Sequence, residues 1–519
     1  MTDTVIPVKA TRREWIGLGV LALPCLLYSM DLTVLILAIP HLSADLAPSS
    51  AQMLWIVDIY GFLVAGSLIT MGTLGDRIGR RKLLMIGATA FGIASIFAAF
   101  ADSAGMLIFA RALLGVAAAT LSPSTLSLIR NMFLDPQERT VAIGVWVASF
   151  SAGGALGPLI GGLLLTWFPW GSVFLIAVPV MVLLLILAPI LLPEYRDPNA
   201  GRLDIVSAFM SLTAVLAIIY GLKWIAESGP GWQPALIIAA GLAIGIAFVR
   251  RQRQLADPLI DMRLFRLPAF SASLAINIVG VFVAFGSFLF FAQYLQLVLD
   301  MGPLEAGLWT APSGLVFIIG SMVTPQIVRR IPPAHVVTAS LCVTALGFAV
   351  LAYAGIAGGL PMLMAGFLIF CFGLSPVFTL TTDLVIGSAP PERAGAASGL
   401  SETSAEFGGA LGIAVLGSIL TAVYRGRMAD LVPPEATPEA AEAARSTLGG
   451  ALTAAAGLPA PAGENLAIAA KAAFVDGFVL VSAISAAGAL AAALLAASLL
   501  RRPGTPAAAE PASVATTGD

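Results

Sequence analysis

The chain has 519 residues, of which 59% are hydrophobic and only 11% charged, and its mean hydropathy is +0.96. Soluble domains carry about 25% charged residues, so this chain lacks the charge to cover a surface that faces water, and lipid must be its solvent. The net charge of −2 says little by itself, but the lack of a basic domain argues against a nucleic-acid partner. The three cysteines lie in apolar runs without CxxC spacing, which predicts neither disulfides nor a metal site.

Continuous apolar runs long enough to cross a bilayer recur along the whole chain. Because they do not alternate with polar residues, they predict helices and not the strands of a barrel. We therefore expect an all-α, polytopic membrane protein, whose first run is retained because it is longer than the apolar core of a signal peptide. The fourteen expected spans are 14–40, 51–74, 82–101, 105–129, 140–165, 170–193, 204–225, 232–249, 270–298, 304–328, 334–355, 360–385, 395–423 and 471–500.

The basic residues are divided unequally between alternate connections. One set of connections holds 21 of the 27 lysines and arginines, with dense groups at 77–82, 250–266 and 329–330. By the positive-inside rule this side is cytoplasmic, so both termini are expected there, in the cytoplasmic (inner) membrane. The opposite connections are assigned only Lys223, Arg425, Arg427, Arg445 and Lys471.

Three segments lie outside the expected spans. Residues 1–13 form a short cytoplasmic tail, and the segment 501–519, rich in Pro, Ala and Thr, is expected to be disordered. The connection 425–470 is long and rich in Ala, Pro and Glu, and Pro438 begins a stretch of strong helix formers. Either an external helical hairpin or a disordered loop fits this composition.

The run from Gly72 to Lys82 joins the second and third spans and combines glycines, a carboxylate and cations. Glycines allow a tight turn and a close approach of helices, and an acid beside a helix start can cap it and pair with cations. Such a cluster can hold two bundles together in one state and release them in another. The alternative is a basic loop that only sets topology. The residues expected to gate are Gly72, Asp76, Arg77, Gly79, Arg80 and Arg81.

Small residues also mark the fifth span. Gly153, Gly157 and Gly161 repeat at i, i+4 and i+8, so they share one face on which another helix can approach closely. Pro158 removes a backbone hydrogen bond and bends the helix. We expect this strip to form a helix contact linked to exchange, with ordinary small-residue packing as the alternative.

Four motifs together resemble the fourteen-span drug:proton antiporters of the major facilitator superfamily, over about residues 14–424. They are Asp31–Pro40 in the first span, Gly72–Lys82 after the second, Arg111–Gly115 in the fourth and Gly153–Gly162 in the fifth. Leu54–Tyr60 and the acids of the thirteenth span look like the Qac-type exporters of quaternary ammonium compounds. The resemblance implies a six-helix bundle over 14–195, an inserted pair over 196–269 and a second six-helix bundle over 270–500.

Charged side chains inside the apolar runs are candidates for function, because each costs roughly 2.5–3.5 kcal/mol to insert. Asp31, Asp58 and Arg111 are expected at similar depth, so that one acid can pair with the arginine. Glu402 and Glu406 are four residues apart on one helical face. The resemblance implies that Asp31, Asp58, Glu402 and Glu406 bind protons or cations. Asp383 lies near the inner end of its span and is interpreted as structural.

Aromatic and polar side chains near these acids are candidates for a pocket, since rings attract cations. Ordinary packing is the alternative for each of them. The candidates are Tyr28, Trp55, Tyr60, Phe150, Phe288, Gln293, Tyr294 and Trp309. Where some Qac-type exporters carry an acid in the tenth span this chain has Val316, which argues against efficient export of divalent cations.

These features favour a proton-coupled antiporter that exports lipophilic, mostly cationic drugs and antiseptics and works as a monomer. No lysine follows a glycine, so a phosphate-binding loop is not expected, and neither is a cofactor. One alternative is an exporter of an endogenous lipid, fatty acid or siderophore with the same fold. A membrane-embedded enzyme is a further alternative, although the sequence offers no nucleophile with a base and no cluster of catalytic or metal-binding residues.

Overall fold

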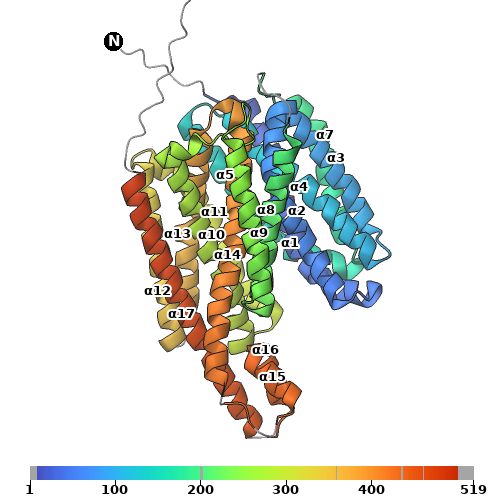
Figure 1. The fold of residues 1–519 in the computed structure, drawn as a ribbon, viewed down its shortest axis with the longest axis vertical. Coiled ribbons are helices and arrows are strands. Elements are labelled where there is room, and N and C mark those ends of the chain that lie inside the picture. Colours follow the sequence, from blue (N-terminus) through green and yellow to red (C-terminus); the bar gives the residue numbers. More distant parts are fainter. Residues whose placement is uncertain are drawn as a thin grey trace, which may run out of the picture.

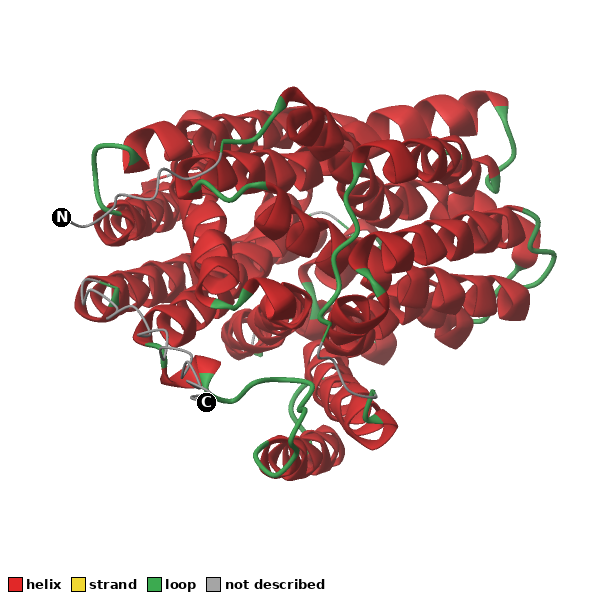
Figure 2. Ribbon diagram, turned by 90° about the horizontal axis from the view of Figure 1, so that it is seen from above, coloured by secondary structure: helices red, strands yellow, loops and turns green. Residues whose placement is uncertain are grey.

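The computed structural model describes residues 9–198, 203–357, 359–429, 431–433, 436–459 and 461–500. Within this part of the chain all regular elements are helices, joined mostly by short loops (Figure 2). The predicted tail over 501–519 lies outside the described residues, as does most of the predicted N-terminal tail. At a few helical positions, including Pro158, the side chain is also outside the description.

The N-terminal half contains six membrane-crossing segments, one of which is interrupted. Its helices are α1 (Arg12–Leu46), α2 (Ser50–Ile78), α3 (Arg80–Ala99), α4 (Ala104–Met132), α5 (Pro136–Trp167), α6 (Ser172–Leu175) and α7 (Ala177–Leu191). The short α6 and α7 follow one another directly and together cross the membrane once. Thr11 and Glu14 form a reciprocal capping box that fixes the start of α1.

The remaining helices complete the fold. They are α8 (Ile205–Ser228), α9 (Trp232–Gln252), η1 (Leu264–Arg266), α10 (Pro268–Gln293), η2 (Tyr294–Val298), α11 (Pro303–Val328), α12 (Pro333–Ala357), α13 (Leu360–Ser388), η3 (Pro391–Arg393), α14 (Ala394–Met428), α15 (Pro438–Ser446), α16 (Leu448–Ala456) and α17 (Ala462–Leu499). The turn η2 is π-helical and extends α10 to the end of its span.

Fourteen helical segments of the described chain are long and apolar enough to cross a membrane, which confirms the predicted number. Their ends differ in places from the apolar runs. α1 extends to Leu46, α14 to Met428, and α17 begins at Ala462, nine residues before the expected start. The helical hydrogen-bond pattern does not depend on lipid, so a helix continues into polar sequence until a turn or a proline stops it.

The helices form two bundles with an inserted pair, as expected for the fold class. One core of buried apolar side chains joins α1–α7, and a second joins α10–α14 with α17. The inserted helices α8 and α9 pack tightly on each other, since a Cβ at Gly241 would lie 2.7 Å from the Ile218 side chain. Smaller apolar clusters attach α8 to α2 through Phe62 and to α14 through Phe407. The inserted pair therefore contacts both bundles.

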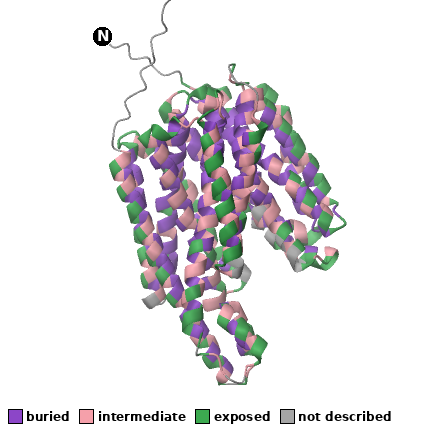
Figure 3. Ribbon diagram, in the orientation of Figure 1, coloured by how far each residue is buried: buried purple, intermediate pink, exposed green. Residues whose placement is uncertain are grey.

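The two bundles meet most closely at one end of the molecule. In Figure 1 they converge at the top, and the N-terminal bundle diverges from α14 toward the bottom. The upper end carries the α2–α3 and α4–α5 turns with Arg77, Arg80 and Arg139, and we call it the basic face. Exposed side chains, many of them apolar, run along the outer sides of the helices, as a surface in lipid requires (Figure 3).

The long connection after α14 is a helical hairpin, the first of the two alternatives left by its composition. α15 and α16 extend beyond the bundle at the end opposite the basic face (Figure 1). Buried Ala444 and Leu448 join the core of the second bundle, and the Tyr424 hydroxyl donates to the Ala444 carbonyl at 2.9 Å. The hairpin is thus anchored to the end of α14.

Candidate functional site

Two carboxyl groups lie between the bundles at the middle of α14. Glu406 accepts a hydrogen bond of 2.8 Å from the Tyr28 hydroxyl of α1, and Glu402 accepts one of 3.0 Å from the Ser122 hydroxyl of α4. Both glutamates are only partly buried. Within the described chain neither carboxylate has a lysine, arginine or histidine within 4.0 Å. Hydroxyl groups of the first bundle therefore hold two acids of the second without neutralising them.

Asp31 and Arg111, which were expected at similar depth, form an ion pair inside the first bundle. Arg111 is fully buried, its Nε donates to the Ile56 carbonyl at 3.1 Å, and its guanidinium lies 4.7 Å from the centre of the Tyr60 ring. A cavity of about 20 Å³, with Asp31 in its lining, lies between α1, α3 and the α6–α7 segment. That volume holds about one water molecule.

Asp58 has a different partner, the Lys223 ammonium group of the inserted helix α8. The side chain of Lys223 is 33% exposed and that of Asp58 is 21% exposed, so this pair is far more open than Asp31–Arg111. The sequence assigned Lys223 to a connection, but it lies inside α8 and faces α2. The rule that selected the acids would have found it, because a lysine inside an apolar run is as costly as an aspartate.

The predicted aromatic side chains separate into groups. Tyr28, which donates to Glu406, lies 6.0 Å from Tyr60 and 5.6 Å from Phe150, measured between ring centres, so these three rings form one cluster that touches Glu406 through Tyr28. Trp55 belongs to another cluster, beside α8.

In the second bundle the remaining candidates do not gather around the acids. Phe288 packs on Phe367, and buried Tyr294 packs on Phe478 inside the helix core. Gln293 is partly exposed and Trp309 is exposed. Whether such a side chain faces the acids depends on the rotation of its helix in the bundle. Neither the side-chain type nor the number of the span reports that rotation.

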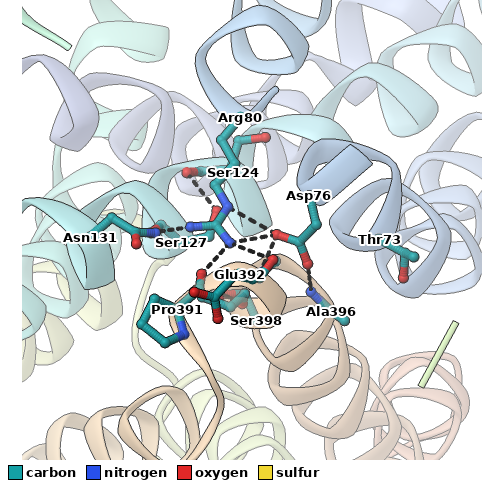
Figure 4. A network of polar contacts seen from close by, with 12 residues as sticks. Thr73, Asp76, Arg80, Ser124, Ser127, Asn131, Pro391, Glu392, Ala396 and Ser398 are labelled. Carbon is teal, nitrogen blue, oxygen red and sulfur yellow. Dashed lines mark hydrogen bonds and ion pairs between the residues drawn. The ribbon is translucent and has the colours of Figure 1, made fainter. Parts of the chain in front are cut away.

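Asp76 caps a helix of the opposite bundle at the basic face (Figure 4). Its two carboxylate oxygens accept hydrogen bonds of 2.9 Å from the backbone N–H groups of Gly395 and Ala396, in the first turn of α14. These N–H groups have no partner within their own helix, and the positive end of the helix dipole favours the carboxylate. Arg80 also donates to Asp76, at 2.7 and 2.9 Å.

Arg80 connects the same contact to the chain before α14. Its guanidinium is almost fully buried and donates to the carbonyls of Pro391 at 2.6 Å and Glu392 at 3.1 Å (Figure 4). Arg77 pairs at 3.1 Å with Asp257 in the segment between α9 and α10. Arg81, in contrast, donates to the Leu192 carbonyl within its own bundle. Of the expected gating group, Gly72, Asp76 and Arg80 thus contact the start of α14 or the chain just before it, whereas the others contact their own bundle or the segment before α10.

Asp383, interpreted from the sequence as structural, forms a second bridge at the basic face. It accepts hydrogen bonds from Arg139 at 2.7 Å and from the Thr140 hydroxyl at 2.6 Å, which joins α13 to α5. Arg130 donates to the Ile386 carbonyl nearby. The basic face is therefore held shut on both sides of the interface, although the second bundle lacks a copy of the Gly72–Lys82 motif.

The glycines allow close helix approach, but at two different interfaces. A Cβ at Gly72 would lie 2.2 Å from the Gly395 carbonyl oxygen, so this glycine permits contact between the bundles near Asp76. Gly79 has φ +112° and forms the turn between α2 and α3. The strip in α5 faces α1 of the same bundle, where a Cβ at Gly153 would lie 2.2 Å from the Leu26 carbonyl oxygen. A Cβ at Gly157 or Gly161 would meet Thr33 or Val34 of α1, whereas a Cβ at Gly162 would meet no other described segment within 4 Å.

Two carboxyl groups outside the spans have shifted pKa values. Burial opposes ionisation of Asp261, but hydrogen bonds from Arg263 and the nearby Arg393 outweigh it, and the pKa of Asp261 is lowered. Hydrogen bonds from Arg251 and Ser207 lower the pKa of Asp204 to about 2. Arg393 immediately precedes α14, so Asp261 connects the segment between α9 and α10 to the closed basic face.

Two helical bundles that cross a membrane, with acids between them and a closure at one face, define a membrane transporter and not an enzyme. The Major Facilitator Superfamily model matches residues 21–413, and the chain belongs to this superfamily. Multidrug efflux pump LfrA of Mycolicibacterium smegmatis is 43% identical over 95% of this chain and 98% of its own length. Methyl viologen resistance protein SmvA of Salmonella typhimurium is 35% identical over 89% of this chain and 93% of its own length.

Solved structures share the fold at low sequence identity. The human organic anion transporter MFSD10 (TETRAN) has a TM-score of 0.61 at 16% identity, covering 93% of this chain and 99% of that one. A bacterial homologue of the human lysosomal transporter Spinster has a TM-score of 0.55 at 20% identity, covering 96% of this chain and 100% of that one. At these identities the likeness concerns the fold alone.

Proposed function

We propose that the protein is a proton-coupled antiporter that exports lipophilic cations, with Glu402 and Glu406 as the groups that exchange protons for cargo. The observation that carries this proposal is the position of the two acids. They lie at the contact between bundles, partly exposed, and are held by the hydroxyl groups of Tyr28 and Ser122. An acid in that position changes its surroundings whenever the bundles move apart.

The coupling follows from the hydrogen bonds that the acids accept. While the bundles are together at this level, Tyr28 and Ser122 stabilise the ionised carboxylates. When the helices separate, each carboxylate loses a donor and must take up a proton or pair with a cation, because an unpaired charge inside a membrane is costly. Binding of a proton and binding of a cationic cargo are therefore alternatives at the same carboxyl group.

The neighbourhood suits cations that are large and lipophilic. Tyr28 donates to Glu406, and the rings of Tyr60 and Phe150 pack on Tyr28, so an aromatic cluster that can attract a positive charge touches this acid. Attraction to a carboxylate and to rings needs no close match of shape, so one site can accept different compounds. Inward proton movement supplies about 2.3 kcal/mol per charge per 100 mV, and about 1.36 kcal/mol per pH unit.

We propose that the basic face is cytoplasmic, because its connections carry most of the arginines and lysines, and that both termini lie on the cytoplasmic side of the inner membrane. With that face closed by Asp76 and Asp383, the conformation corresponds to one that is open to the outside. Release of these contacts would open the cytoplasmic side for loading of cargo. The cycle needs a membrane, a proton gradient and one copy of the chain, and it uses no cofactor.

The names of the relatives favour drug export over the alternatives. LfrA is a multidrug efflux pump, SmvA confers methyl viologen resistance, and a Streptomyces glaucescens protein 31% identical over 93% of this chain is a tetracenomycin C resistance and export protein. Methyl viologen and many dyes are cations, which agrees with acids as the binding groups. A cargo such as a fatty acid would have to approach carboxylates of the same charge.

The proposal is tested by following ethidium efflux from preloaded cells that lack their own exporters. We expect efflux that a protonophore stops, a loss of at least tenfold in Glu406→Gln, and a smaller loss in Glu402→Gln. Glu464→Gln provides a control, because Glu464 is exposed at the start of α17 and undergoes the same chemical change. Efflux that persists with the protonophore, or in the variant that carries both substitutions, would contradict the proposal.

A further inference from the structure

At the contact between α2 and the inserted helix α8, a lysine ammonium group lies beside a carboxylate and an aromatic ring. The Lys223 ammonium group pairs with the Asp58 carboxylate and lies 4.7 Å from the centre of the Phe62 ring. Both charged side chains remain partly exposed. A carboxylate beside an aromatic face is the arrangement that recognises ammonium ions.

Further rings extend this site along the two helices. Trp55 stacks on Tyr220 with ring centres 6.4 Å apart and an angle of 12°, and both rings lie near 6.1 Å from Phe62. Trp224 lies 5.8 Å from Tyr220. On α8 the residues at 220, 223 and 224 follow helical spacing, as do those at 55, 58 and 62 on α2, so each group lies on one face of its helix.

The site also touches α14, the helix that carries the two glutamates. Phe62 of α2, Ile219 of α8 and Phe407 of α14 share one apolar cluster, and Phe407 directly follows Glu406. Lys223 also interacts electrostatically with Glu406. The lysine is therefore paired with a carboxylate of the first bundle and exposed to the field of one in the second. It belongs to the inserted helix pair, which is additional to the two six-helix bundles.

We propose that Lys223 is a tethered cation that occupies the Asp58 end of the cargo site and determines which cargo charge is accepted. This inference rests on the proposed function and adds a selectivity residue to the same site. Cationic cargo that reaches Asp58 must displace the ammonium group, which remains nearby and repels it. Glu406 offers the displaced ammonium group another partner, so the displacement does not leave an unpaired charge inside the membrane.

The repulsion depends on the charge of the cargo. The Coulomb energy between Lys223 and a ligand is proportional to ligand charge, so a dication is opposed twice as strongly as a monocation at the same place. Removing the ammonium charge should therefore improve dication binding by roughly the square of the factor found for a monocation. Val316 in the tenth span and Lys223 in the seventh would then both act against divalent cargo.

The experiment measures binding to the purified full chain in detergent. Ethidium is the monocation, and its binding is followed by fluorescence; methyl viologen is the dication, and its binding is measured by competition with ethidium. For Lys223→Gln we expect ethidium to bind about threefold more tightly and methyl viologen about tenfold, the latter equal to about 1.4 kcal/mol. Asp58→Asn should weaken both, again with the larger factor for methyl viologen. Lys471→Gln, which removes a lysine paired with Asp300 away from the site, should change neither.

The variant that carries both Asp58→Asn and Lys223→Gln removes a carboxylate and an ammonium together, and should restore the original ratio of the two affinities. Equal factors for the two probes, or no change in either single variant, would overturn the inference. The Asp58→Asn result keeps the test valid if Lys223→Gln does not fold. Failure of the unaltered protein to bind either probe would contradict the proposed function itself, which is a separate outcome.

Discussion

The charged side chains between the helices fall into three environments that differ in partner and in exposure. Arg111 is fully buried and paired with Asp31, whereas Lys223 and Asp58 form a partly exposed pair. Glu406 accepts a hydrogen bond from the Tyr28 hydroxyl and has no cation within 4.0 Å among the described residues. A buried pair is costly to break, because one charge is then left without compensation. A carboxylate held by a hydroxyl can take up a proton without leaving a cation behind, so the glutamates are the groups best suited to exchange.

Replacing Arg111 should destabilise the first bundle strongly. Arg111→Gln leaves Asp31 as an uncompensated acid among apolar side chains, with an expected loss of about 3–5 kcal/mol of stability or uptake of a proton by Asp31. The melting temperature of the purified protein reports the loss. The variant that also carries Asp31→Asn should recover most of the stability, and a double variant as unstable as the single one would contradict an ion-pair role.

Some of these residues could be found from the sequence, and others could not. Charge within an apolar run identifies Asp31, Arg111 and the glutamates, since the energetic cost holds wherever the residue faces. The partners could not be found in the same way. Ser122 is an ordinary helix residue until α4 is placed beside α14, and Lys223 lies near enough to a span end to be assigned to a connection.

At the scale of helices, α1 and α5 approach so closely that their contact leaves no room for a side chain. Gly153→Ala would place a Cβ 2.2 Å from the Leu26 carbonyl oxygen, so the helices must move apart. We expect a clear fall in melting temperature and in transport. Gly162→Ala is the matched control, because nothing lies within 4 Å of that position. Equal effects of the two substitutions would show that helix propensity, and not the contact, is responsible.

The inserted helices are joined at the basic face by Asp204 and Arg251, and this contact should depend on pH. Asp204 has a pKa of about 2 in the folded protein, against about 3.9 in an unfolded chain. Its contribution to stability is therefore present above pH 4 and is lost as the pH falls from about 4 toward 2. Melting temperatures of the unaltered protein and Asp204→Asn should converge over that range. A constant difference would contradict the assignment.

For the whole molecule, the closed basic face is the feature that defines its conformation. Asp76 accepts two backbone hydrogen bonds across the interface, and charge-assisted bonds contribute about 1.5–3 kcal/mol each. Asp76→Asn should thus raise the population open at this face by about tenfold or more. In a variant with the native cysteines replaced, Ser124→Cys beneath Gly75 should react correspondingly faster with a water-soluble thiol reagent. An unchanged rate would show that Asp76 does not hold the face closed.

The architecture was more predictable than the contacts. The fourteen spans could be predicted from hydropathy, because each apolar run that is as long as the bilayer is thick counts as one span. The rotation and neighbours of each helix depend on packing, which a single sequence does not display. For that reason the strip at Gly153 could be predicted to contact a helix but not which one, and Asp383 could be interpreted as structural without its partner Arg139.

The most direct test of the account counts protons when cargo binds. Ethidium is added to the purified protein in weakly buffered detergent solution near neutral pH, and the release of protons is measured with a pH indicator. We predict release from the unaltered protein and a reduced release from Glu402→Gln and Glu406→Gln under conditions where ethidium is still bound. Saturating binding of ethidium with no release of protons at any pH between 5 and 8 would contradict exchange at these carboxyl groups.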